Sequence, residues 1–292
     1  QISYNFILMK ILIIGARGLL GSFLYSKLKK KYKVFGSSRY NMKNYYKIDL
    51  NNLTSVKNIF KINSFDVIIN TSGLVDVDKC NKDMALAKKF NSQTIKRLSI
   101  ILNTVNQKPH LIHFSTDQIY NNKNPNKSNK EKDVRVSNNY SKSKYLGELN
   151  THNYKKKTIL RTNFFGSRIN SNKLSYSDYL IHNLKNQKII KIPSNAYFSP
   201  IHMTFITNVL DKIISKKIYG TFNLGSSSGI SKYEFAKKIA QIKKLPIKFL
   251  SPYISNIKIH QRPNGTIMNV KKIEKRLKIK LPTISKSLQI LS

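Results

Sequence analysis

Cysteine, tryptophan and acidic side chains are scarce in this sequence of 292 residues. The single cysteine, Cys80, excludes a disulfide scaffold and a zinc site built from cysteines. It fits a reducing compartment, and we expect a cytoplasmic protein. The six histidines show no spacing typical of metal ligands, so we expect no metal. No apolar run approaches the roughly 20 residues of a transmembrane helix, and we expect no membrane partner.

The shortage of acidic residues leaves a strong excess of positive charge. The chain has 13 Asp and Glu against 53 Lys and Arg, a formal net charge of +40. Such a field attracts phosphate, so nucleic acid is one candidate partner. The lysines are spread along the whole chain, however, and no recognised nucleic-acid-binding motif is present. We therefore favour a general compositional bias, in a field that would also help to capture an anionic nucleotide substrate.

Short apolar runs alternate with helical patterns through the first half of the chain. The expected strands are 10–14, 34–35, 45–50, 67–70, 110–114 and 158–162, and the expected helices are 19–28, 53–62, 85–106 and 140–150. Strand and helix repeated in this way predict an α/β fold. We expect a Rossmann-type doubly wound parallel sheet with helices on both faces.

The pattern loosens in the second half, where glycine and proline separate shorter elements. We expect a Rossmann domain over 9–165 and a smaller C-terminal α/β substrate domain over 166–292. The chain is expected to return to the main sheet near 199–225. Residues 1–8, ahead of Met9, are interpreted as an N-terminal extension.

A glycine-rich loop follows the first expected strand and opens the first expected helix. Its residues are Gly15, Ala16, Arg17, Gly18, Leu19, Leu20 and Gly21. Glycines in this context let the backbone approach a pyrophosphate, which the N–H groups of the helix N-terminus then bind. The loop therefore predicts a dinucleotide site, although a plain glycine turn has the same spacing.

The second expected strand is followed by Ser38 and Arg39 rather than by Asp or Glu. An NAD site places an acidic residue there to bind the ribose 2′-hydroxyl. A hydroxyl and a cation, with Arg17 nearby in the glycine loop, suit a 2′-phosphate instead. We therefore predict NADP(H) as the cofactor. The alternative is that Arg39 is one more surface cation.

Tyr140 and Lys144 are spaced so that they share one helix face. A free tyrosine has a pKa of about 10, and a neighbouring ammonium group stabilises its phenolate and lowers that pKa. Tyr25 and Tyr233 have lysines at the same spacing, so spacing alone does not identify a site. Its position in the chain distinguishes Tyr140 from the other two tyrosines. Tyr140 follows Ser115-Thr116-Asp117, which lies at the carboxyl end of an expected strand, the edge where α/β sheets bind ligands.

Further motifs accompany these in order: Asp49-Leu50, Asn70-Thr71-Ser72-Gly73, Phe114 to Asp117, Leu146-Gly147-Glu148, Arg161-Thr162 and Arg262-Pro263. With them the chain resembles the extended short-chain dehydrogenase/reductases from Met9 onward. Within these it is most similar to the dTDP-4-dehydrorhamnose reductase branch.

The resemblance implies a function and assigns residues to it. The implied reaction is the NADPH-dependent reduction of the C4 ketone of a nucleotide-linked 4-keto-6-deoxy sugar, as in the biosynthesis of deoxysugars for cell-surface polysaccharides. Its catalytic residues would be Thr116, Tyr140 and Lys144. Asp49, Leu50, Thr71, Ser72 and Gly73 would join the glycine loop, Ser38, Arg39, Tyr140 and Lys144 in binding the cofactor. Asp117, Gln118, Phe164 and Arg262 are substrate candidates, and homodimers are common in the superfamily.

Two departures from the family pattern leave the sugar open. Gln118 stands where the family usually has an aromatic residue, and Asn163-Phe164-Phe165 replaces a segment that usually carries tryptophan. An epimerase or dehydratase with the same catalytic residues is one alternative, although dehydratases typically carry an acidic pair after the catalytic threonine. A second alternative is a non-catalytic NADP-binding subunit, similar to the regulatory subunits of methionine adenosyltransferase.

Overall fold

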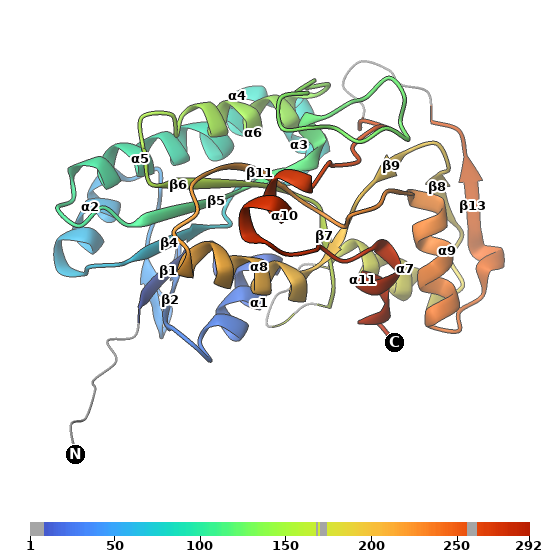
Figure 1. The fold of residues 1–292 in the computed structure, drawn as a ribbon, viewed down its shortest axis with the longest axis horizontal. Helices are drawn as coiled ribbons and strands as arrows, with labels where there is room; N and C mark the ends of the chain where they lie inside the picture. Colours follow the sequence, from blue (N-terminus) through green and yellow to red (C-terminus); the bar gives the residue numbers. More distant parts are fainter. Residues whose placement is uncertain (1–8, 168, 170–173, 256–261) are drawn as a thin grey trace.

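The computed structural model describes residues 9–167, 169, 174–255 and 262–292. The N-terminal extension predicted at residues 1–8 lies outside these ranges. Within them, a parallel sheet with helices on both faces occupies most of the molecule, and a smaller group of elements lies beside it (Figure 1).

The sheet has seven strands in the order β11-β6-β5-β4-β1-β2-β3, and every neighbouring pair is parallel. The strands are β1 (Lys10–Ile14), β2 (Lys33–Ser38), β3 (Tyr45–Lys47), β4 (Val67–Asn70), β5 (His110–Thr116), β6 (Lys157–Thr162) and β11 (Gly220–Leu224). The order reverses beside β1, since β2 lies on one side of it and β4 on the other. This is the switch point at which doubly wound sheets bind ligands, so the Rossmann-type prediction is confirmed.

Five helices that follow β3 in the first half cover one face of the sheet. They are α2 (Leu53–Ile62), α3 (Val77–Lys82), α4 (Met84–Lys88), α5 (Thr94–Thr104) and α6 (Asn139–Leu149), and α1 (Leu19–Leu28), α8 (Met203–Ser215) and α10 (Lys271–Leu277) lie on the other face (Figure 1). Each face has its own apolar core, because alternate side chains of a strand point to opposite sides. No described helix has the length and hydrophobicity to cross a bilayer.

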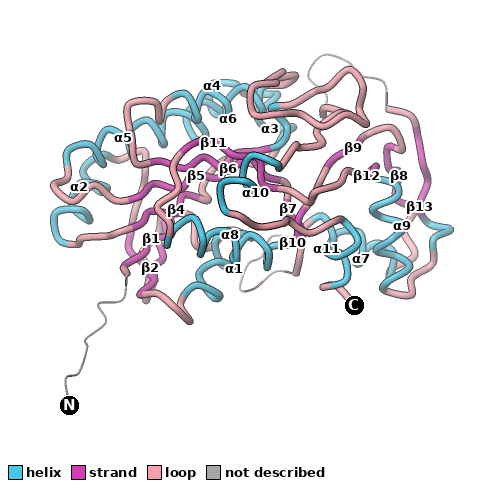
Figure 2. Tube along the Cα trace, in the orientation of Figure 1, coloured by secondary structure: helices cyan, strands magenta, loops and turns pink. Residues whose placement is uncertain are grey.

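The C-terminal elements lie beside the main sheet (Figure 2) and have a third apolar core of their own. It is formed by β7 (Phe164–Phe165), α7 (Tyr176–Lys185), β8 (Ile190–Pro193), β9 (Tyr197–Phe198), β12 (Ile230–Ser231), α9 (Lys232–Ile242), η3 (Ile247–Phe249), β13 (Leu250–Tyr253) and α11 (Ile284–Gln289). The strand β10 (Ile201–His202) pairs with β7, but Ile201 packs in the core beside α1 and α8. Three small sheets join these strands in the pairs β10-β7, β12-β9 and β13-β8. The division at residues 165 and 166 stays a prediction, and β11 of the second half lies in the main sheet beside β6.

The long helix expected over 85–106 is interrupted. A π-helical turn, η1 (Lys89–Gln93), separates α4 from α5. By contrast, α6 begins within one residue of the prediction, because Asn138 and Ser141 cap it reciprocally through side chain and backbone. A short 3-10 turn, η2 (Asp117–Ile119), follows β5 directly and leads into the long polar connection to α6.

Candidate active site

The glycine loop turns tightly between β1 and α1 and packs against the end of β4. Gly15 has φ +83°, in the region that favours glycine. A Cβ at Gly21 would lie 2.2 Å from the carbonyl oxygen of Gly15 and 2.7 Å from Thr71 Oγ1. Thr71 Oγ1 donates to the carbonyl oxygen of Ile14 at 2.9 Å, which fixes the loop beside β4. The α1 N-terminus therefore opens at the carboxyl edge of the sheet, as an anion site requires.

The predicted 2′-phosphate residues lie at the end of β2. Ser38 is buried and its hydroxyl accepts from the backbone N–H of Tyr40 at 3.1 Å. Arg39 and Arg17 are exposed, and the Arg39 guanidinium lies 5.7 Å from the centre of the Phe90 ring of η1. A guanidinium held by an aromatic face remains free to bind an anion with its N–H groups.

The remaining predicted cofactor residues are divided between loop and core. Leu20 and Leu50 bury their side chains in the two cores, so only their backbones can face a ligand. Asp49 accepts from the backbone N–H of Asn51 at 2.9 Å, an interaction within its own loop. At the end of β4, Ser72 Oγ donates to Asn70 Oδ1 at 2.6 Å. A Cβ at Gly73 would lie 3.9 Å from Lys144 Nζ, which places this loop beside α6.

Thr116 and Tyr140 come together at the carboxyl end of β5. Both side chains are buried, and they share a hydrogen bond. Lys144, one turn further along α6, is buried and donates from Nζ to the carbonyl oxygen of Phe114 at 2.7 Å. The three residues predicted to be catalytic therefore lie at one place, where the first turns of α6 cross the end of β5.

Burial controls the protonation of this group. It raises the pKa of Tyr140 to about 12, although the Thr116 hydrogen bond acts in the opposite direction. It lowers the pKa of Lys144 to about 8, while the charge of Glu148 raises it. The lowered tyrosine pKa expected from the sequence is therefore not observed. Tyr140 is protonated at neutral pH and is suited to donate a proton.

Asp117 is fully occupied by internal contacts. Its Oδ2 accepts from Asn163 Nδ2 at 3.0 Å and from Thr266 Oγ1 at 2.9 Å. Burial raises the pKa of Asp117, and these hydrogen bonds and the charge of Lys232 act against that rise. Asp117 thus joins β5 to two distant segments of the chain, which a direct substrate ligand would not require.

The other substrate candidates differ in position. Gln118 has a buried Oε1 without a hydrogen-bond partner among the described residues. Phe164 packs against the main core from β7 and is half-buried. Arg262 is exposed, lies 3.9 Å from Asp78 Oδ2, and its charge acts on the pKa of Tyr140. Gln118 and Arg262 are therefore the better placed of these residues to meet a ligand.

Two residues near this site were not predicted. Asn91, in the π-helical turn η1, accepts from the backbone N–H of Leu74 at 2.8 Å and donates to Ser143 Oγ at 3.0 Å. Lys232, at the start of α9, has a pKa lowered to about 8, first by burial and then by Arg262. Lys232 carries no sequence signal, because lysine is abundant throughout this chain. The five-residue step from Phe90 to Ile95 in the apolar pattern is a signal that could have indicated the π-turn.

Comparison of the sequence with known proteins identifies a family and two relatives. The family model described as RmlD substrate binding domain matches residues 9–291. The spore coat polysaccharide biosynthesis protein SpsK of Bacillus subtilis is 26% identical over 244 residues, covering 83% of this chain and 82% of that protein. The dTDP-D-glucose 4,6-dehydratase of Dictyostelium discoideum is 28% identical over 275 residues, 80% of this chain and 62% of that protein.

The fold is also similar to that of a solved structure. The dTDP-4-dehydrorhamnose reductase from Bacillus anthracis, in complex with NADP, superimposes with a TM-score of 0.87 at 21% identity. The match covers 97% of this chain and 98% of that one. Within the described ranges, no group of three or more His, Cys, Asp or Glu side chains could hold a metal ion.

Proposed function

The chain belongs to the RmlD substrate binding domain family, within the extended short-chain dehydrogenase/reductases, and we propose that it reduces the C4 ketone of a nucleotide-linked 4-keto-6-deoxy sugar with NADPH. The observation that carries this proposal is the buried meeting of Thr116, Tyr140 and Lys144. It lies at the carboxyl edge of the sheet, where the glycine loop also opens.

The residues present fit a phosphorylated dinucleotide. The positive φ of Gly15 and the close backbone approach at Gly21 leave a cradle that a Cβ would fill. The N–H groups at the start of α1 would hold the pyrophosphate. Arg17 and Arg39 are exposed cations near the loop and would hold the 2′-phosphate. Gly73 and Lys144 lie next to each other and would face the nicotinamide ribose.

NADPH, when bound, supplies the hydride that reduces the ketone. The Tyr140 hydroxyl donates the proton to the ketone oxygen as that oxygen gains charge, since this phenol is protonated at neutral pH. The Thr116 hydroxyl, already hydrogen-bonded to Tyr140, stabilises the same oxygen. Lys144 presents a cation beside the tyrosine, and its ammonium can exchange the Phe114 carbonyl for a ribose hydroxyl.

A dehydratase is the main alternative, and one relative carries that name. Dehydration removes a proton and a hydroxyl group, which requires an acid and a base besides the tyrosine. In this chain Gln118 follows Asp117, and the Asp117 carboxylate is already bound by Asn163 and Thr266. The residues around Thr116 therefore favour reduction.

Cofactor binding and turnover test the proposal separately. Purified protein is titrated with NADPH and with NADH by fluorescence, and NADPH oxidation is followed with a dTDP-4-keto-6-deoxy sugar. We expect tighter binding of NADPH, and turnover that is lost in Tyr140→Phe. Binding without turnover would point to another nucleotide sugar or to a non-catalytic subunit. Absence of dinucleotide binding would refute the proposal.

A further inference from the structure

Three successive turns of α6 contact three consecutive residues at the end of β5. Tyr140 bonds Thr116, Lys144 bonds the carbonyl oxygen of Phe114, and Glu148 accepts from Ser115 Oγ at 2.5 Å. The helix residues are spaced by four, so they lie on one face of α6 and point at the sheet. The first two contacts belong to the candidate active site. The third does not, and it holds the residue immediately before Thr116.

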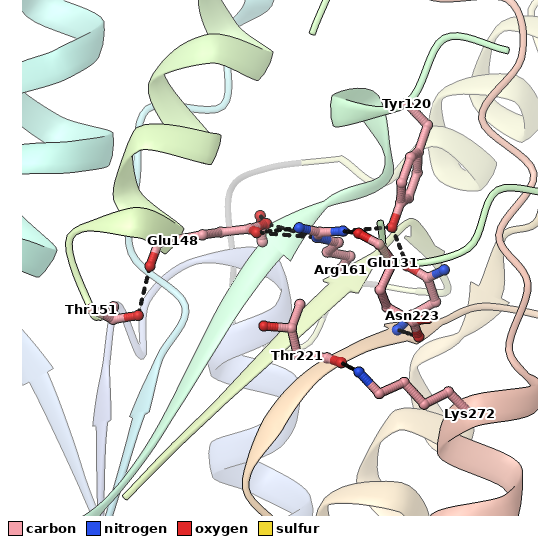
Figure 3. Close-up of polar contacts among 9 residues, drawn as sticks. Tyr120, Glu131, Glu148, Thr151, Arg161, Thr221, Asn223 and Lys272 are labelled. Carbon is pink, nitrogen blue, oxygen red and sulfur yellow. Dashed lines mark hydrogen bonds and ion pairs between the residues drawn. The ribbon is translucent and has the colours of Figure 1, made fainter. Parts of the chain in front are cut away.

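Glu148 is itself fixed by a buried arginine (Figure 3). Arg161 of β6 donates from Nη2 to Glu148 Oε2 at 2.6 Å and from Nε to both carboxylate oxygens at 3.1 Å. The exposed fractions of the two side chains are only 5% and 4%. A two-oxygen contact of this kind restricts the orientation of the carboxylate as well as its position.

The arginine is also held from its other side. Arg161 Nη1 donates to Tyr120 Oη at 2.7 Å and to the carbonyl oxygen of Glu131 at 2.6 Å. Tyr120 in turn donates to Asn223 Oδ1 of β11 at 2.7 Å. Figure 3 shows this chain of contacts running from α6 across β6 to β11. Glu148 is therefore anchored to the sheet through groups that themselves have hydrogen-bond partners. Its own side-chain hydrogen bonds go to Ser115 and Arg161.

We propose that Glu148 is a positioning residue, which fixes the register between α6 and the end of β5 through Ser115 and so keeps Tyr140 and Lys144 aligned with Thr116. The proposal rests on the proposed function for its kinetic consequence, because alignment matters where a proton is transferred. A small displacement of α6 would separate the Tyr140 hydroxyl from the Thr116 hydroxyl without unfolding the protein.

Ser115→Ala tests this with the ion pair left intact, since Arg161 still satisfies Glu148. Thr151→Val is the matched control. Thr151 is also buried and donates to the main-chain carbonyl of Glu148 at 2.7 Å, but it makes that bond within the α6 end and not to β5. We expect kcat to fall about tenfold or more in Ser115→Ala with little change in KM. In Thr151→Val both constants should stay near the wild-type values.

Glu148→Gln extends the test, because the amide keeps the shape and one acceptor. Its kcat should fall at least as much as in Ser115→Ala, because the amide also weakens the contact with Arg161. Adding Ser115→Ala to Glu148→Gln should lower kcat little further, as expected when both residues act through the same link. Equal kcat in Ser115→Ala and Thr151→Val would overturn the proposal. So would additive losses in the double variant.

Hydrogen exchange supplies a readout that needs no substrate. Amides in residues 139–144 should exchange faster in Ser115→Ala than in Thr151→Val, because the first turns of α6 lose a tether to β5. Equal exchange would refute the positioning role. If wild type fails to turn over the sugar but exchange responds as expected, the proposed reaction is wrong and the positioning role stands. If wild type turns over the sugar and exchange is equal in the two variants, the positioning role is wrong and the proposed reaction stands.

Discussion

The two ends of the candidate site are built in different ways. At the reacting end, Thr116, Tyr140 and Lys144 are buried, and each is held by a side-chain or carbonyl contact. At the phosphate end, the glycine loop is set by its backbone, and the cations Arg17 and Arg39 are exposed. Buried groups have their protonation set by the fold, whereas exposed cations keep their charge and are screened by salt. Changes at the first end should therefore alter turnover, and changes at the second should alter binding.

The largest effect is expected from Tyr140→Phe, at the reacting end. Loss of the hydroxyl removes the proton donor while the ring still fills the pocket formed with Val77, Cys80 and Ala87. We expect kcat to fall by about 10²–10⁴-fold, the usual contribution of a general acid. The dissociation constant of NADPH should change little, measured by fluorescence titration. A variant that keeps most of its kcat would mean that another group supplies the proton.

One buried and one exposed ion pair allow the effect of burial on the free energy of unfolding to be compared. Glu148→Ala leaves the Arg161 cation buried and should lower the free energy of unfolding by about 3–5 kcal/mol. Asp211→Ala breaks the pair with Lys31, whose side chains are 34% and 61% exposed, and screening by solvent limits that contact to about 0–1 kcal/mol. Asp211 also accepts from Tyr32, so Lys31→Ala is the cleaner comparison. Urea denaturation measures the free energy of unfolding of all three variants. Equal losses of stability would contradict the expected difference between the buried and the exposed pair.

At the phosphate end, Arg39→Ala should weaken NADPH binding by about tenfold, as expected for one charge-assisted contact at an exposed site. The affinity for NADH should not change, because NADH lacks the 2′-phosphate. Lys43→Ala is the matched control, since it removes another exposed cation from the loop that follows β2. If the two variants weaken NADPH equally, Arg39 is an ordinary surface cation and acts only through the general field.

The sequence predicted the reacting end because its signals are local. Tyr140 and Lys144 share a helix face, and Thr116 ends a strand, so element order alone brings them to one edge of the sheet. The contact of Glu148 with Ser115 and Arg161 depends on how α6 packs across β5 and β6, which periodicity does not specify. The π-helical turn at Asn91 was missed for a different reason. The apolar residues Phe90 and Ile95 are five positions apart rather than three or four, and one long helix was predicted across this break.

Burial also explains why the protonation of the site was predicted in the wrong direction. A tyrosine next to a lysine was expected to have a lowered pKa, because a nearby cation favours the phenolate. In the fold, desolvation dominates and raises the pKa of Tyr140 to about 12. The degree of burial depends on the whole arrangement of α3, α4 and α6, which the spacing of two residues does not contain.

The smallest effect at neutral pH is expected from the titration of Lys144. Its pKa of about 8 means that it is a cation at pH 7 and loses its charge as the pH rises through 8. The carboxylate of Glu148 in α6 raises the pKa of Lys144. His113 of β5 has a pKa lowered by burial and by the charge of Lys144, so it adds no charge to this group near neutral pH. We therefore expect kcat/KM to be nearly constant below pH 7.5 and to fall about tenfold per pH unit above ~8, since this ratio reports the free enzyme.

Lys144→Arg distinguishes this titration from that of Tyr140. Arginine stays protonated throughout, so the alkaline decline should move upward toward the pKa of Tyr140, even if the absolute rate is lower. In Glu148→Gln the decline should move to lower pH, because the carboxylate that raises the pKa of Lys144 is gone. A decline that remains near pH 8 in Lys144→Arg would assign it to a different group.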